Sequence, residues 1–151
     1  MTPHQMAIVK STWRQATPMA DTVSELFYDR LFEIDPGIGD MFDGIDMENQ
    51  RNKLIQALAL VVESLDQIDH IIPIVETLGR RHASYGVTDR HYETVGAALL
   101  WTLEKGLSES WTADVKTAWT TAYTTIANIM RSAAANQDGP DQTIQPRATI
   151  A

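Results

Sequence analysis

Apolar residues recur at three- and four-residue intervals along most of the chain, the spacing that places them on one face of an α-helix. This spacing predicts helices over residues 2–16, 18–34, 47–65, 71–85, 88–107 and 112–133. Almost no stretch shows the strict alternation that favours a half-buried β-strand. The pattern therefore predicts an all-α fold of six or seven helices in one domain.

Residues that begin and end helices separate these segments. Thr17 is predicted to cap the second helix, with Pro18 at the first helical position, where its missing N–H group costs nothing. Pro36 and Gly86 follow two of the helices and are expected to end them. Beyond residue 134 the chain has too few apolar residues to build a core. We therefore expect one folded domain over residues 1–134 and a flexible tail over residues 135–151.

One predicted helix carries a histidine on its apolar face. The inward residues are Ile71, Ile74, Val75, Leu78, His82 and Tyr85. An inward-pointing histidine is either a core side chain hydrogen-bonded to a backbone carbonyl or the ligand of a metal. The spacing alone leaves both interpretations of His82 open.

Other helices are expected to bring polar side chains toward His82. Tyr28 lies on the second helix, and Phe42 lies in the loop that follows it. Gln50 lies one turn before Leu54, where it either faces the same pocket or forms a partly exposed rim. One nitrogen ligand in an apolar cavity suits a haem better than zinc, which takes three or four protein ligands.

Composition narrows the class of protein. The chain of 151 residues has no cysteine and a formal net charge of −8. The missing cysteines exclude disulfides and thiolate chemistry, and they favour a cytoplasmic location. The acidity argues against nucleic acid as a partner, since binding the phosphate backbone requires a basic surface. We also expect no membrane association, because no signal peptide or membrane-spanning run is present, and neither a phosphate-binding glycine loop nor an HExxH motif occurs.

Several segments together resemble a known family. The matching segments are Phe27-Tyr28-Asp29-Arg30-Leu31-Phe32, Pro36, Phe42, Leu78-Gly79-Arg80-Arg81-His82, Tyr85-Gly86-Val87, His91-Tyr92-Glu93-Thr94-Val95-Gly96, Leu99-Leu100, Ala118-Trp119 and Ala122-Tyr123. They spread over residues 5–133 and resemble the globins, in particular bacterial single-domain haemoglobins, the globin part of flavohaemoglobins, and neuroglobin. The resemblance implies a globin fold of six to eight helices around a haem pocket.

The resemblance also implies roles for individual residues around a haem b. His82 corresponds to the proximal ligand of a five-coordinate iron, and Phe42 corresponds to the phenylalanine that stacks on the porphyrin. Leu54 and Leu78 are expected to contact its apolar faces. Tyr92 corresponds to a tyrosine that supports the proximal histidine in flavohaemoglobins. In flavohaemoglobins a glutamate also supports the proximal histidine, and we expect its position to fall near residue 134, which is alanine in this chain.

On the distal side the resemblance implies that Tyr28 and Gln50 hydrogen-bond the ligand. Dioxygen is the expected ligand, with nitric oxide and carbon monoxide as others. Many animal globins have a distal histidine where this chain has Gln50, so the bis-histidine state of neuroglobin is not expected. Lys53 and Arg81 are candidate partners for the haem propionates, although Lys53 could equally be ordinary surface.

Two other functions stay open at this point. The first is a nitric oxide dioxygenase or haem peroxidase supplied with electrons by a separate reductase, because we expect no reductase domain after residue 151. The second is a haem-free helical interaction protein, which would require the stripe around His82 to be ordinary core. An absorption spectrum with haem present separates this last class from the other two.

Overall fold

The computed structural model describes residues 1–136, which contain α-helices, short 3₁₀ helices and no β-strand. The predicted all-α fold is confirmed. The α-helices are α1 (Pro3–Ala16), α2 (Ala20–Ile34), α3 (Pro36–Asp40), α4 (Met47–Glu63), α5 (Ile72–Ser84), α6 (Asp89–Leu107) and α7 (Ala113–Ala135). Helix α7 ends one residue beyond the predicted domain boundary, and the rest of the predicted tail, from residue 137, lies outside the described residues.

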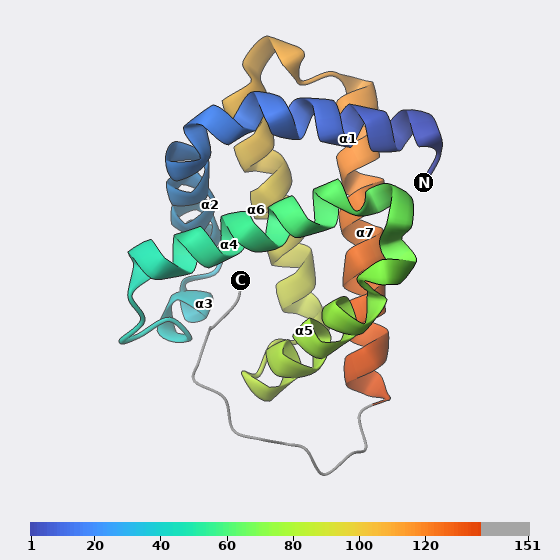
Figure 1. Ribbon diagram of the computed structural model, residues 1–151. Helices are drawn as coiled ribbons and strands as arrows, with labels where there is room; N and C mark the ends of the chain where they lie inside the picture. The colour runs from blue at the N-terminus through green and yellow to red at the C-terminus, as the bar shows by residue number, and fades with distance from the viewer. Residues whose placement is uncertain (137–151) are drawn as a thin grey trace.

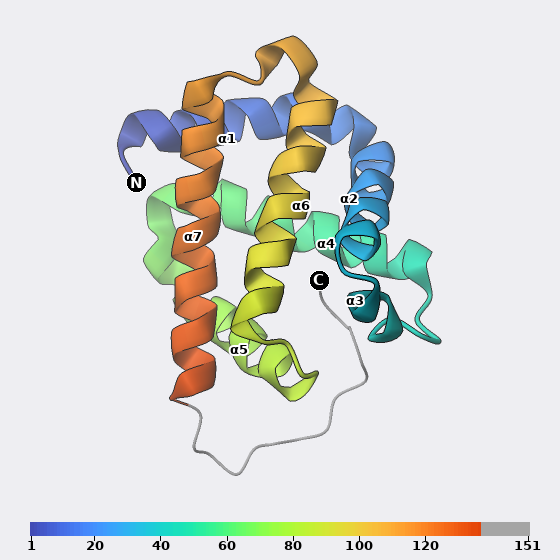
Figure 2. The same cartoon turned by 180° about the vertical axis from the view of Figure 1, so that it is seen from behind.

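Two long helices form the back of the molecule. Helices α6 and α7 run side by side, and α1 and α4 cross them on one side (Figure 1). Seen from behind, α6 and α7 lie in front, and α5 lies at the same end of the molecule as the C-terminal half of α7 (Figure 2). None of the helices within residues 1–136 is long and apolar enough to cross a membrane.

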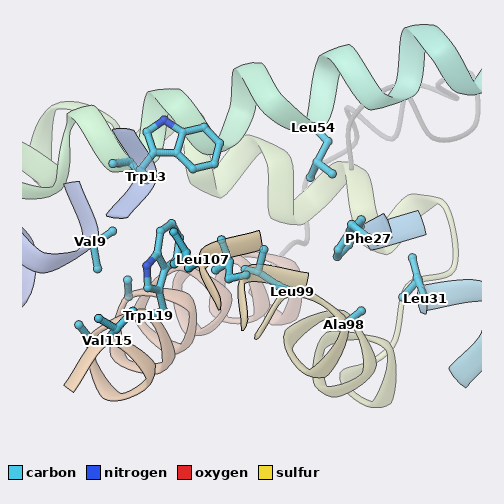
Figure 3. Close-up of a cluster of buried hydrophobic side chains, with 14 of the residues drawn as sticks. Val9, Trp13, Phe27, Leu31, Leu54, Ala98, Leu99, Leu107, Val115 and Trp119 are labelled. Carbon is cyan, nitrogen blue, oxygen red and sulfur yellow. The ribbon is translucent and has the colours of Figure 1, made fainter. Parts of the chain in front are cut away.

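The main core joins α1 to α7 (Figure 3). The rings of Trp13 and Trp119 lie 6.3 Å apart between their centroids. The Trp119 indole Nε1–H donates a hydrogen bond of 2.8 Å to the Thr12 hydroxyl, and that hydroxyl donates to the Ile8 carbonyl. A buried indole N–H needs such an acceptor, so this chain of bonds fixes how α1 lies across α7.

Helix α5 approaches α7 more closely than side chains normally allow. A Cβ atom added at Gly79 would overlap the carbonyl oxygen and Cα of Met130. Glycine is therefore required at this crossing, because no other residue lacks a Cβ atom. The contact fixes the position of the helix that carries His82.

Two local predictions were wrong. Thr17 does not cap α2: its hydroxyl donates to the Trp13 carbonyl, and a 3₁₀ helix, Thr17–Met19, separates α1 from α2. Ile74 is 46% exposed rather than buried. The buried face of α5 contains Val75, Gly79 and His82, and Ile74 lies at the edge of that face because the α-helical period rotates it away from α7.

Candidate functional site

A cavity of about 250 Å³ lies between α2 and α4 on one side and α5, α6 and α7 on the other. Aliphatic and aromatic side chains form most of its wall. Six of the residues predicted from the sequence line it: Tyr28, Phe42, Leu54, Leu78, His82 and Tyr92. The folded chain thus brings together residues as far apart in the sequence as Tyr28 and Tyr92.

His82 contributes a buried imidazole in a defined tautomer. The residue is 8% exposed, and its Nδ1 lies 2.7 Å from the Leu78 carbonyl oxygen. A carbonyl oxygen can only accept a hydrogen bond, so Nδ1 carries a proton, and in the neutral imidazole the lone pair is then on Nε2. Histidine ligands of metals commonly donate their second ring N–H to a backbone carbonyl in this way. The bond to a carbonyl expected of a core histidine is therefore also the bond that prepares a ligand.

The end of α5 is shaped by a glycine. Gly86 has a φ of +92°, a conformation that side chains with a Cβ rarely adopt. After this turn, the Val87 N–H donates to the His82 carbonyl at 3.0 Å, and Val87 joins the cavity wall. The Tyr85 ring lies 6.3 Å from the His82 ring and lines the same cavity. The turn therefore closes the cavity next to the imidazole.

A buried polar pair lies on the α2 and α4 side. Tyr28 is 3% exposed and Gln50 is 1% exposed, so the interpretation of Gln50 as a partly exposed rim residue was wrong. The Gln50 Nε2 donates a hydrogen bond of 3.2 Å to the Tyr28 hydroxyl oxygen. Because that oxygen accepts from Gln50, the Tyr28 proton is directed away from Gln50. Gln50 does not itself line the cavity but positions the hydroxyl that does.

The environment of Tyr28 keeps it a neutral donor. Burial raises the pKa of Tyr28 above its ordinary value, while the hydrogen bond from Gln50 and the charge of Arg51 lower it by less. Its ring packs edge-on against Phe27 at 5.0 Å and against Phe42 at 5.6 Å between centroids. The ring is therefore held by aromatic packing, and its hydroxyl is held by the hydrogen bond from Gln50.

Tyr92 lies on the α5 side of the cavity, on α6. It is 8% exposed, and its hydroxyl has no hydrogen-bond partner within the described residues. Its backbone carbonyl accepts a hydrogen bond of 2.6 Å from the Tyr123 hydroxyl of α7. Burial raises the pKa of Tyr92 to about 12; the nearby Arg131 lowers it and Asp89 raises it, each by less.

Lys53 and Arg81 are half-buried and do not line the cavity. Each lies one residue before a buried residue, Leu54 and His82 respectively. Their predicted contact with propionates stays a prediction.

Three residues of the cavity wall were not predicted from the sequence to lie there: His91, Tyr123 and Met130. Met130 is buried because it falls on the face of α7 that meets α5 at Gly79. Extending the spacing from Tyr123 through residues 126 and 130 would have found this face, since those positions differ by three and four.

The donor set fits a haem. Within residues 1–136, no three His, Cys, Asp or Glu side chains gather to hold a metal ion. A haem needs only one axial protein ligand, because the porphyrin supplies the other nitrogens. His82 offers that ligand in the correct tautomer, and the apolar wall suits the faces of a porphyrin.

A helical protein with one buried imidazole and a tyrosine–glutamine pair around an apolar cavity has the features of a haem-pocket protein. The globin family model matches residues 25–130, and this chain belongs to the globin family. The bacterial globin from Campylobacter jejuni superimposes with a TM-score of 0.76 at 23% identity, covering 89% of this chain and 96% of that one, which confirms the globin fold.

Two curated relatives are longer proteins. The flavohemoprotein of Bacillus subtilis is 33% identical over 123 residues, which cover 80% of this chain and 31% of that protein. A flavohemoprotein of Xylella fastidiosa is 31% identical over 131 residues, covering 85% of this chain and 33% of that protein. The chain thus spans about a third of the length of these relatives.

Proposed function

We propose that this protein binds one haem b in the main cavity and reversibly binds dioxygen, with nitric oxide and carbon monoxide as further ligands. His82 holds the iron through Nε2, and the haem supplies an iron that takes up diatomic ligands. Phe42, Leu54 and Leu78 contact the porphyrin faces. The observation that carries the proposal is the Gln50–Tyr28 hydrogen bond on the opposite side of the same cavity from the His82 imidazole.

The polar pair explains why dioxygen is favoured. Gln50 fixes the Tyr28 hydroxyl so that it donates into the cavity. Dioxygen that takes on negative charge accepts this bond strongly in a dry pocket, whereas carbon monoxide carries little charge and gains less. A donor to a charged acceptor contributes about 1.5 to 3 kcal/mol. Tyr28 and Gln50 therefore discriminate between the two ligands through charge rather than size.

The first experiment is the absorption spectrum of the protein with added haem in its ferric, ferrous and carbonmonoxy forms. A Soret band with a five-coordinate ferrous form is expected. The second experiment measures the dissociation rates of dioxygen and carbon monoxide in the Tyr28→Phe variant by stopped flow. Dioxygen release should be about tenfold to a hundredfold faster, with a much smaller change for carbon monoxide. An unchanged ratio of the two rates would reject the role of Tyr28.

A second candidate function is nitric oxide dioxygenation, in which nitric oxide, dioxygen and one electron yield nitrate. The similarity to flavohemoproteins favours it. A reductase would have to supply the electron. Sustained nitric oxide consumption with an added reductase and NADH, at a rate far above that of either protein alone, supports this function. Consumption limited to a single turnover supports ligand binding alone.

A further inference from the structure

One stripe of residues on α6 runs along the wall of the main cavity. His91, Val95 and Leu99 follow one another at intervals of four, so they share one face of the helix, and all three line the cavity. Leu99 is buried, whereas His91 and Val95 are half-buried. The wall therefore becomes more accessible to water toward the first turn of α6, and His91 lies at that open end.

The His91 ring is held by the start of its own helix. The Thr88 backbone N–H donates a hydrogen bond of 3.0 Å to the His91 Nδ1. An amide N–H can only donate, so Nδ1 carries the lone pair and Nε2 carries the ring proton. Within residues 1–136 the ring makes no second hydrogen bond. The Nε2–H group is thus a donor of fixed tautomer, on the side of the ring away from Nδ1, without an acceptor among the described residues.

His91 supplies a nitrogen donor that the rest of the wall lacks. Three side chains with a ring nitrogen line the cavity: His82, His91 and Trp119. The Trp119 Nε1–H donates to the Thr12 hydroxyl, and the His82 Nε2 is the atom proposed to hold the iron. No lysine or arginine of the described chain lines the cavity. An anionic group at the open end would therefore find its nitrogen donor at His91.

A haem would bring anionic groups to this open end. Its ring suits the apolar wall, whereas its two propionates are charged and are stable only where water or a polar partner reaches them. We propose that His91 binds a haem propionate, with its Nε2–H donating to a carboxylate oxygen. The inference rests on the proposed haem-binding function and adds a second polar attachment point to that of the iron. Hydrogen bonds to a carboxylate are stronger than those between neutral groups.

The start of α6 adds to the attraction for an anion. Helix α6 has 19 residues, and the unpaired backbone N–H groups of its first turn give that end a partial positive charge. Asp89 and Arg90 lie in the same turn with opposite charges, and both are exposed and do not line the cavity. Lys53 and Arg81, the candidates predicted from the sequence, do not line the cavity either. His91 is therefore better placed than these two to bind a propionate.

The test compares two variants of nearly equal shape, His91→Gln and His91→Glu. Both side chains have an oxygen that can accept from the Thr88 N–H at this capping position, so the start of α6 should be kept. A glutamine side chain also has N–H donors, whereas a glutamate has only acceptors and a negative charge. Each variant is loaded with protohaem or with protohaem dimethyl ester, in which both propionates are uncharged. Loss of haem to excess apomyoglobin is then followed by absorption.

We expect His91→Glu to release protohaem about tenfold faster than the parent protein, and His91→Gln to stay within about threefold of the parent. With the dimethyl ester the two variants should release at nearly the same rate, because the negative charge of the propionates is gone. Arg90→Gln is the matched control: it also makes the net charge more negative by one unit, at an exposed neighbour that does not line the cavity. It should behave like the parent with both haems.

Two results would overturn the proposal. The first is equal release of protohaem from His91→Gln and His91→Glu, and the second is a difference between them that is as large with the dimethyl ester. Circular dichroism shows that each variant is folded, and His91→Ala, tested with both haems, covers the case in which His91→Glu unfolds. If the parent protein gives no Soret band with either haem, the haem-binding function itself is rejected, and the role of His91 with it.

Discussion

Two tyrosines in the wall of the main cavity, Tyr28 on α2 and Tyr92 on α6, differ in the hydrogen bonding of their hydroxyls. Tyr28 and Tyr92 are both buried and both line the main cavity. The Tyr28 hydroxyl accepts a bond from Gln50, whereas the Tyr92 hydroxyl has no partner within the described residues. Within residues 1–136, the chain therefore supplies a polar partner to the buried hydroxyl of Tyr28 and none to that of Tyr92.

The two sides are also held in place by different means. Tyr28 is held by aromatic packing against Phe27 and Phe42. The histidine helix is held by direct backbone contact at Gly79, where no side chain intervenes. A change on the Tyr28 side should therefore alter ligand chemistry more than folding. A change at the helix crossing should do the reverse.

The largest effect is expected for His82→Ala. The variant removes the iron ligand but keeps the apolar wall, so haem should dissociate more than about a hundredfold faster, since loss of a mere second-sphere partner already costs tenfold to a hundredfold. Transfer of haem to excess apomyoglobin measures the rate, and added imidazole should partly restore the spectrum by filling the space. Retention of haem with an unchanged ferrous spectrum would show that His82 is not the ligand.

The next effect concerns the helix crossing. Gly79→Ala should destabilise the fold by about 1 to 3 kcal/mol, because the new methyl group overlaps the Met130 backbone and α5 must move. Gly106→Ala is the control: it lies in α6, and its added Cβ would make an ordinary contact of 3.5 Å with Val23. Urea denaturation of both variants measures the difference. Equal free energies of unfolding for the two variants would show that α5 and α7 can move apart to fit the methyl group at little cost.

A double-mutant cycle tests whether Gln50 acts on the ligand through Tyr28. Gln50→Leu alone should speed dioxygen release by up to about tenfold, less than Tyr28→Phe, because Gln50 acts through the hydroxyl that it positions. Once Tyr28 is phenylalanine, removal of Gln50 should add little, so the two effects should not be additive. Additive effects measured by stopped flow would mean that Gln50 contacts the ligand independently of Tyr28.

The smallest effect concerns alkaline pH. Burial raises the pKa of Tyr92 to about 12, above the value of about 10 in an unfolded chain. Above pH 10 the unfolded state therefore loses the tyrosine proton while the folded state keeps it. The free energy of unfolding should fall by up to about 1.4 kcal/mol per pH unit for this tyrosine, and stability is complete below pH 10. Urea denaturation from pH 8 to 11 should give a shallower slope for Tyr92→Phe than for the parent protein, and identical slopes would contradict the shift.

The sequence predicted the helices and six lining residues well because both depend on local spacing and on a resemblance carried by short segments. The spacing alone left the burial of Gln50 open, since the burial of a polar residue at the end of a stripe depends on a partner 22 positions away. The spacing also predicted that Ile74 points inward. Periodicity shows which way the apolar face of a helix points, but it does not show how wide the buried part of that face is.

The tryptophan pair described in the core has an optical consequence. Trp119 lines the main cavity, and Trp13 lies 6.3 Å from it between ring centroids. A porphyrin in that cavity absorbs at the wavelengths where indoles emit, so it would accept their excitation energy over such short distances. The fold thus contains its own fluorescent reporter. Tryptophan emission would be strong when the cavity is empty and quenched when a porphyrin fills it. No dye or tag is needed to follow haem entry in real time.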